Sequence, residues 1–349
     1  MTNDVRKSEE FAKKNKKLKE LSNQLPDCCQ SFLFETGSEM SIATRLAYAR
    51  ELGWFFDYLQ GFSPVFCDTN KRNVSLDQVN QITSQDISRY ITMAFDNGMQ
   101  EKTVARKRAA LSSFFSYLTA NRMIEFNPVN AAAKVKIHSS DKVIYMNFDE
   151  QRTLLNSVQD GSLLAPRAQT LHEKYRARDI ALITLLLDTG MRVSELHGIS
   201  INDINLDDCS VYVIRKGGDG ATLYYSDEVR SLLEDYINER TAKSGKLKPE
   251  DPLFVTTNGH RLSVRAVQLL VKKYTINALP GKGGKLSPHK MRSSFAMGFY
   301  GVTKDVLALQ KKMGHKSIIA TNIYAKATDE QMKDTRSIMA TARSSNQNK

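Results

Sequence analysis

The sequence predicts a mainly α-helical protein with two domains and a small antiparallel β-sheet in the second domain. Its 349 residues are enough for two domains that each bury a core. Apolar side chains recur at helical spacing over most of the chain. The clearest strand-like alternation lies in residues 203–225, on both sides of a glycine-rich turn. A hydrophobic fraction of 41% and a charged fraction of 25% are ordinary for a globular protein.

The charge balance points to a polyanionic partner. The formal net charge is +12 and the pI is near 9.4, which favours nucleic acid, with a membrane surface as the competing polyanion. No apolar run approaches the roughly 18 residues of a membrane-spanning helix, and charges occupy the N-terminal region where a signal peptide is apolar. We therefore expect a soluble, intracellular protein that has no membrane partner.

The four cysteines do not form a metal-binding pattern. No C-x-x-C pair occurs among Cys28, Cys29, Cys67 and Cys209. Cys28 and Cys29 are adjacent, so they are poorly placed to form a disulfide with one another. We expect buried or partly buried thiols in a reducing compartment and no structural zinc.

The N-terminal part of the chain is predicted to be helical. Residues 8–25 are lysine-rich and amphipathic, in an arm that we place at residues 1–37. This arm either touches DNA or a neighbouring subunit, or packs as a solvated helix on the next domain. That domain, at residues 38–129, contains helices with broad apolar faces, at residues 41–60, 84–97 and 101–121.

Local signals mark where these helices begin and end. Ser84 is a plausible N-cap for the helix that it opens. Asn127-Pro128 ends the first domain, because the residue before proline resists helix. The small and basic segment that follows predicts a linker over residues 130–146, ahead of a second domain at 147–349.

The second domain combines helices with the predicted hairpin. An apolar helix over residues 176–187 leads into the turn at 188–190, and Arg192 comes directly after that turn. Residues 161–173 suggest a polar loop. The strands are expected at 203–214 and 221–225, and the other helices at residues 148–157, 227–243, 264–277 and 329–342.

The segment at residues 286–326 is the richest in chemistry. Ser287-Pro288 predicts a helix start, with serine as the N-cap and proline at the first helical position. His289 and Arg292 are three residues apart, so both lean to one face of that helix. A second helix over residues 305–313 ends at Gly314, which suits a left-handed C-cap, and His315 follows at once. Tyr324 lies nine residues further on.

These residue types suit attack by a tyrosine on a phosphodiester. A phenol attacks usefully where cations favour the phenolate or where another group accepts its proton. Arginine forks match phosphate oxygens bidentately, and imidazoles can donate to an oxygen or move a proton. Any single histidine or tyrosine here is more simply a buried structural residue, but their joint spacing favours a phosphotyrosine linkage.

Four stretches together resemble the tyrosine recombinases, the family of phage integrases and Xer-type resolvases. They are HKMR, MGHKSIIATNIYAK, LLLDTGMRVSELHGIS with Arg192 and Glu195, and VYVIRKGGDGATLYY with Lys216. The resemblance covers residues 143–349 with these motifs in the family's order. It implies that a helical core-binding domain and an α+β catalytic domain close as a clamp around DNA. The basic cluster of Lys102, Arg106, Lys107 and Arg108 would then lie against phosphates, although such side chains are equally common as a solvated face.

The resemblance also implies a mechanism. Tyr324 is the nucleophile, Arg192 and Arg292 bind the phosphate, and His315 donates to it. His289 is the candidate for proton transfer, Lys216 for the general acid, and Glu195 for a supporting role. The 3′-phosphotyrosine intermediate conserves bond energy, so no metal, ATP or other cofactor is expected.

The implied partners are double-stranded DNA with an inverted-repeat core site and three further copies of the chain. The copies would form a homo-tetramer through exchange of the helix at residues 329–342, and accessory proteins are left open. The implied location is the bacterial cytoplasm, at the nucleoid.

Three departures leave the subfamily undecided. Ser293 follows Arg292 where a basic residue is common, Lys290-Met291 replaces a less polar pair, and Ala325-Lys326 replaces Thr-His. Xer-type resolution and integration or excision of a mobile element both fit, and the departures slightly favour the latter. A type IB topoisomerase, which shares the chemistry, and a non-catalytic DNA-binding regulator are the alternatives.

Overall fold

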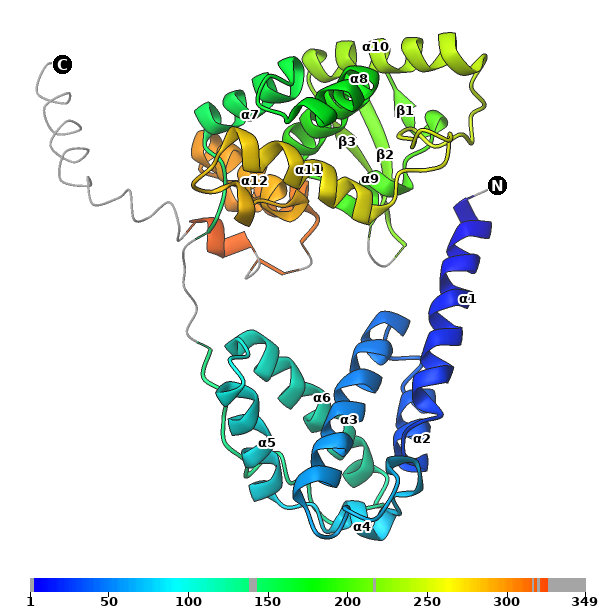
Figure 1. Ribbon diagram of the computed structural model, residues 1–349, viewed down its shortest axis with the longest axis vertical. Helices are drawn as coiled ribbons and strands as arrows, with labels where there is room; N and C mark the ends of the chain where they lie inside the picture. Colours follow the sequence, from blue (N-terminus) through cyan, green and yellow to red (C-terminus); the bar gives the residue numbers. More distant parts are fainter. Residues whose placement is uncertain (1–2, 138–142, 216–217, 316, 319–320, 326–349) are drawn as a thin grey trace, which may run out of the picture. The chain divides into compact units, whose positions relative to one another are not determined.

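The computed structural model of the chain describes residues 3–137, 143–215, 218–315, 317–318 and 321–325. The chain divides into two compact units, residues 1–140 and 141–349, and the division falls inside the predicted linker (Figure 1). Both units are mainly helical, and the sheet that the structure describes has three antiparallel strands in the second unit. The predicted fold class is confirmed.

The first unit is a helical domain built around aromatic side chains. Phe32, Phe55, Phe114 and Phe115 are fully buried at its centre. Leu18 and Leu25 belong to the same core, so the N-terminal segment shares the hydrophobic core of this unit. Its helices are α1 (Asn3–Ser22), α2 (Asp27–Glu35), α3 (Ile42–Phe62), α4 (Leu76–Asn80), α5 (Ser84–Asp96) and α6 (Glu101–Ala120). The short helices α2 and α4 were not predicted.

The start of α5 corrects one prediction. Thr83, rather than Ser84, is the N-cap, because its hydroxyl accepts a hydrogen bond from the Asp86 backbone N–H. The Asp86 carboxylate accepts in return from the Thr83 N–H at 2.9 Å, which completes a capping box. Ser84 is the first helical residue.

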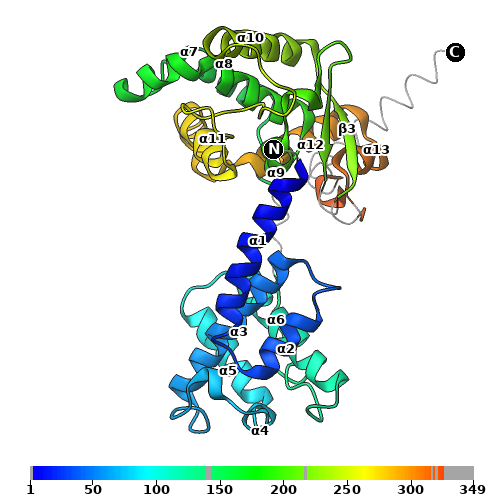
Figure 2. The ribbon, with the colours of Figure 1, turned by 90° about the vertical axis from the view of Figure 1, so that its right-hand side faces the viewer.

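Most helices of the second unit pack around one apolar core that also takes in the sheet, and a smaller apolar cluster joins α12, α13 and Tyr324. Figures 1 and 2 both show α10 running along α8. The helices are α7 (Phe148–Asp160), α8 (Pro166–Thr189), α9 (Val193–Gly198), α10 (Asp227–Ser244), α11 (Val264–Ala278), α12 (Pro288–Thr303) and α13 (Val306–Met313).

The predicted loop at residues 161–173 is wrong over most of its length, because α8 already begins at Pro166. The exposed side of this segment is polar, so its sequence pattern resembles that of a loop. Its buried polar contact is made by His172. His172 is 3% exposed, and its Nδ1 lies 2.9 Å from the Tyr274 hydroxyl. One buried polar contact therefore fixes a turn of helix whose sequence is otherwise that of a surface.

The sheet is the predicted hairpin with a short third strand. Strand β2 (Ser210–Ile214) pairs with β3 (Gly220–Tyr224), and Val211 lies opposite Leu223. The predicted strand over residues 203–214 is interrupted, because β1 (Ile204–Asn205) turns back to pair antiparallel with β2.

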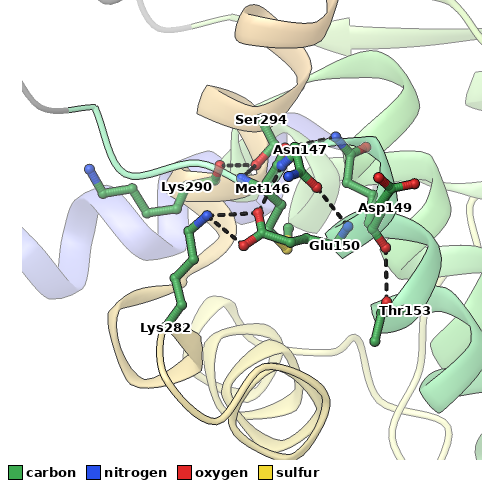
Figure 3. Close-up of polar contacts among 9 residues, drawn as sticks. Met146, Asn147, Asp149, Glu150, Thr153, Lys282, Lys290 and Ser294 are labelled. Atoms are coloured by element: carbon green, nitrogen blue, oxygen red, sulfur yellow. Dashed lines mark hydrogen bonds and ion pairs between the residues drawn. The ribbon is translucent and has the colours of Figure 1, made fainter.

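Contacts between distant segments hold α12 in place (Figure 3). The Ser294 hydroxyl accepts from the Met146 N–H at 2.8 Å and donates to the Lys290 carbonyl at 2.9 Å. Lys282, in the loop before α12, binds both carboxylate oxygens of Glu150 at 2.8 and 2.7 Å. The segment at the start of α7 is thus joined both to α12 and to the loop before it, and the helix that carries His289 and Arg292 has a fixed position.

The described residues contain no helix that is both long and apolar enough to cross a membrane. All four cysteines are free thiols. Cys28 and Cys29 are buried and Cys209 is partly buried, as predicted, whereas Cys67 is exposed. No group of three metal-ligating side chains occurs in the part of the chain that the structure describes.

Candidate active site

The corner between α8 and α9 presents Arg192. Gly190 ends α8 with φ +61°, the left-handed conformation that glycine adopts without strain. A Cβ on Gly190 would lie 2.3 Å from the Phe295 ring, so glycine also lets α12 approach this corner. Arg192 is the N-cap residue of α9, immediately beyond the turn. Arg192 is thus found directly after the turn, as the sequence predicts.

Glu195 holds Arg192 through two hydrogen bonds. One carboxylate oxygen accepts from the Arg192 backbone N–H at 2.7 Å, and the other accepts from Nη1 at 2.8 Å. The Glu195 side chain is 3% exposed and that of Arg192 is 32% exposed. The carboxylate is therefore buried behind the guanidinium, and the guanidinium keeps an accessible side.

Arg292 is the buried cation of the site. It projects from α12, is 4% exposed, and donates through Nη1 to the Gly190 carbonyl at 2.6 Å and through Nη2 to the Met313 carbonyl. Burial, and then the charge of Arg192, lowers the pKa of Arg292 to about 10. These two bonds account for two of the five N–H donors of a guanidinium, and Arg292 links the α8 corner to the end of α13.

His315 follows α13 at a left-handed cap. Gly314 has φ +60°, as predicted for the C-cap. The His315 Nδ1 lies 2.9 Å from the Thr321 hydroxyl, and Thr321 is fully buried. Burial, followed by the charges of Arg292 and Arg192, lowers the pKa of His315 to about 4. The imidazole is therefore neutral at physiological pH.

His289 lies in the first turn of α12. The predicted helix start is found at Pro288, but Ser287 makes no side-chain capping hydrogen bond, which corrects that part of the prediction. His289 keeps an exposed face. Loss of surrounding water, and then the charges of Lys290, Arg292 and Arg192, lowers its pKa.

Tyr324 is 6% exposed and packs with apolar side chains of α12 and α13, among them Met297 and Leu309. The negative charge of its ionised form raises the pKa of Arg292, so the phenol lies within electrostatic range of that guanidinium. Lys216 and residues 329–342 lie outside the described residues.

Arg215, at the end of β2, belongs to the same site and was missed by sequence reasoning. Its Nη2 donates to the Lys312 carbonyl at 3.1 Å, and its charge lowers the pKa of both Arg292 and His315. The sequence signal that could have identified Arg215 is its position as a second cation directly before Lys216, at the end of the strand. Taken together, the structure gathers three guanidinium groups, two imidazoles and a phenol, with Glu195 as the carboxylate that binds Arg192.

The basic cluster of the first unit divides into surface and interior. Lys102 and Arg106 are exposed, whereas Lys107 is 4% exposed. The Lys107 ammonium donates to Glu51 at 2.9 Å and to the Tyr90 hydroxyl at 3.1 Å. The structure contradicts a DNA contact for Lys107, because α6 turns this side chain into the core.

Arg108 is partly buried and donates to two backbone carbonyls, Val129 at 2.9 Å and Ala133 at 3.3 Å. A DNA contact by Lys102, Arg106 or Arg108 stays a prediction.

Two family patterns match the chain. Residues 145–331 match the Phage integrase family, and residues 30–122 match its N-terminal SAM-like domain. Tyrosine recombinase XerC of Caldanaerobacter subterraneus subsp. tengcongensis is 33% identical over 321 residues, which covers 88% of this chain and 85% of that protein. Tyrosine recombinase XerC of Bacillus subtilis is 30% identical over 256 residues, covering 72% and 79%.

Solved structures share the fold. The Tn1549 transposon integrase in complex with transposon right end DNA has a TM-score of 0.63 at 18% identity, covering 88% of this chain and 98% of that one. The XerH site-specific recombinase bound to palindromic difH substrate has a TM-score of 0.61 at 21% identity, covering 84% and 79%. At such low identity these two likenesses establish the fold and nothing finer.

Proposed function

The chain belongs to the phage integrase family of tyrosine recombinases, and on this premise we propose that it cuts and rejoins DNA strands at a specific site through a 3′-phosphotyrosine intermediate. One observation carries the proposal. The charge of Arg192 lowers the pKa of Arg292, His289 and His315, and the ionised form of Tyr324 raises that of Arg292. Cations that lower the pKa of their neighbours are stabilised by an anion placed among them, and a backbone phosphate is such an anion.

In the proposed reaction, the Tyr324 oxygen forms a bond to phosphorus while the bond from phosphorus to the 5′-oxygen breaks. The accessible side of Arg192 and the remaining donors of Arg292 bind the non-bridging oxygens and stabilise the added charge of the transition state. The carboxylate of Glu195 keeps the Arg192 fork oriented. The cationic role is assigned to these side chains, and no metal or ATP enters the scheme.

The proton steps are divided among three groups. His289, whose lowered pKa keeps it neutral, accepts the phenol proton. If the Thr321 hydroxyl donates to the Nδ1 of His315, then Nε2 carries the proton and donates to the phosphate. Lys216 gives a proton to the departing 5′-oxygen. Reversal of the same steps by a 5′-hydroxyl reseals the strand.

The test is covalent capture on a suicide DNA substrate, in which the cut end diffuses away. We expect Tyr324→Phe to lose the covalent adduct completely and to bind DNA as the unaltered chain does. Tyr300→Phe is the matched control. Tyr300 lies in α12 and, like Tyr324, is buried in the same apolar cluster. An adduct formed by the Tyr324 variant would assign the nucleophile elsewhere.

Joining assays separate recombination from topoisomerase action. A recombinase transfers a strand from one duplex to another that carries the same site, whereas a topoisomerase only relaxes supercoils. The XerC relatives favour a Xer-type resolution over excision of a mobile element. An inverted repeat around a short spacer beside the gene would identify the site that such an assay needs.

For the assembly, we propose a tetramer on DNA in which residues 329–342 of one copy bind the next copy. A groove of about 480 Å³ between α7, α8 and α12 can receive them. Phe148 is 63% exposed and Val302 76% exposed in it, and Asp188 and Glu228 supply acidic groups. The sequence of the segment contains the apolar residues Met332, Ile338 and Met339, which suit the apolar wall, and the cations Lys333 and Arg336, which suit the carboxylates.

Val302→Glu tests this groove, because it places a charge where the apolar segment would lie. We expect recombination and tetramer formation on DNA to fall while cleavage by single subunits persists. Removal of the residues after Thr328 should have the same effect. Leu307→Glu is the control, since Leu307 is 66% exposed on α13 and is not among the residues that line the groove. Unchanged recombination in the truncated chain would rule out the exchange.

A further inference from the structure

Two guanidinium groups bind neighbouring carbonyls at the end of α13. The last carbonyls of a helix have no partner within it and carry the negative end of the helix dipole. Here Gln310 and Lys311 accept from the Gly314 N–H, Lys312 accepts from Arg215 at 3.1 Å, and Met313 accepts from Arg292. The end of α13 is therefore held by one arginine from α12 and one from the sheet.

The contact with Arg215 depends on Gly314. A Cβ on Gly314 would lie 1.6 Å from Nη1 and 2.3 Å from Cζ of Arg215, so the guanidinium rests directly on the glycine backbone. Gly314 also has φ +60°, a conformation that side chains disfavour. Two separate constraints thus act at the residue immediately before His315.

The other end of Arg215 is fixed by the hairpin. Its backbone N–H donates to the Asp219 carbonyl at 2.8 Å, and its carbonyl accepts from the Gly218 N–H at 3.1 Å. The side chain therefore starts from a closed turn and ends on α13. It joins the sheet to the segment that carries His315.

We propose that Arg215 is a positioning residue of the phosphate site, which holds the corner of Gly314 and His315 against the β2–β3 hairpin so that His315 faces the phosphate bound by Arg192 and Arg292. This inference rests on the proposed function. It gives Arg215 a role different from that of Arg292, whose buried guanidinium contacts the phosphate in the proposed scheme. Arg215 acts on the reaction through the placement of His315.

The first test compares Arg215→Ala with Arg230→Ala in covalent capture. Arg230 is a matched control on α10, 39% exposed and paired with Asp227 at 3.1 Å. We expect the Arg215 variant to cleave about 10- to 100-fold more slowly, because small misplacements of catalytic groups cost about that much. DNA affinity should change less than about threefold, since other cations supply the binding charge. Arg215→Lys should recover part of the rate.

The second test is a double-mutant cycle with Gly314→Ala. In the unaltered chain this change meets both the left-handed backbone and the Arg215 guanidinium. In the Arg215→Ala background the guanidinium is gone, so Gly314→Ala should slow cleavage by a clearly smaller factor. Equal factors in both backgrounds would overturn the contact.

The third measurement is the titration of the His315 ring by NMR. Arg215 is one of the cations that lower the pKa of His315, so Arg215→Ala should raise that pKa and Arg230→Ala should leave it unchanged. An unchanged pKa would contradict the placement of Arg215. If Arg215 variants cleave normally while Tyr324→Phe makes no adduct, only this inference fails. If Tyr324→Phe makes the adduct, the proposed function itself fails.

Discussion

The first unit and the candidate active site of the second unit both bury charged side chains, but they do so in opposite ways. In the first unit, Glu51 is 2% exposed and accepts from Lys107 at 2.9 Å and from Arg106 at 3.0 Å. Lys107 also donates to Tyr90 and lies 4.2 Å from the centre of the Trp54 ring. A carboxylate, a hydroxyl and an aromatic face thus surround this ammonium, and the buried charge is matched within the unit.

At the candidate active site of the second unit, the buried charges are not matched in this way. Arg292 donates to backbone carbonyls, Glu195 is bound to Arg192, and His315 has a pKa of about 4. The comparison teaches that burial of a cation has two meanings. A buried cation that meets its own carboxylate is matched within the fold, whereas cations that repel one another suit the binding of an anion, as in the proposed function.

The largest expected effect concerns the matched cluster. Glu51→Ala leaves Lys107 buried without its carboxylate, so the free energy of unfolding should fall by about 3–5 kcal/mol in urea denaturation. Asp57→Ala is the control, because Asp57 pairs with Lys71 and its side chain is 50% exposed. The control should cost less than about 1 kcal/mol. Similar losses in both variants would remove the distinction between the two kinds of pair.

The next effect concerns the unmatched cluster. Arg192→Lys keeps the positive charge but loses the planar fork that binds Glu195 and that, in the proposed function, also binds the phosphate. We expect the barrier to single-turnover cleavage to rise by about 2–4 kcal/mol, as for the loss of an oxyanion donor. The free energy of unfolding should change much less. Near-normal cleavage would show that charge alone suffices at this position.

The third effect is a pH dependence of stability. His315 has a pKa of about 4 in the folded chain, against about 6.5 for an unperturbed histidine. The unfolded chain therefore binds a proton between these values that the folded chain does not, and stability is lost as the pH falls from about 6.5 towards 4. His315→Gln should reduce the slope of the unfolding free energy against pH. The reduction corresponds to the uptake of at most one proton on unfolding. Identical pH profiles would contradict the depressed pKa.

The comparison also shows how far the sequence can be read. The order of the motifs, the hairpin and the left-handed cap at Gly314 follow from local patterns, and all three are found. Lys107 could not be placed from the sequence. Arg106 reaches the same Glu51 carboxylate and stays exposed, so the charges on this helix do not show which one is buried. Glu51, which holds Lys107 inside, lies 56 residues earlier.

The sequence by itself determined most of the long helices, the hairpin and the motif residues of the site, because caps, periodicity and residue types act over a few neighbouring residues. It did not determine the short helices α2 and α4, the start of α8 or the presence of Arg215 in the site. Only the tertiary structure decided which cations are matched and which are left facing one another. That difference depends on partners such as the carbonyls of Gly190 and Met313, whose distances from Arg292 are set by the packing of α8, α12 and α13. The same packing brings Arg215 into the site, because its guanidinium donates to the carbonyl of Lys312, which lies 97 residues later in the chain.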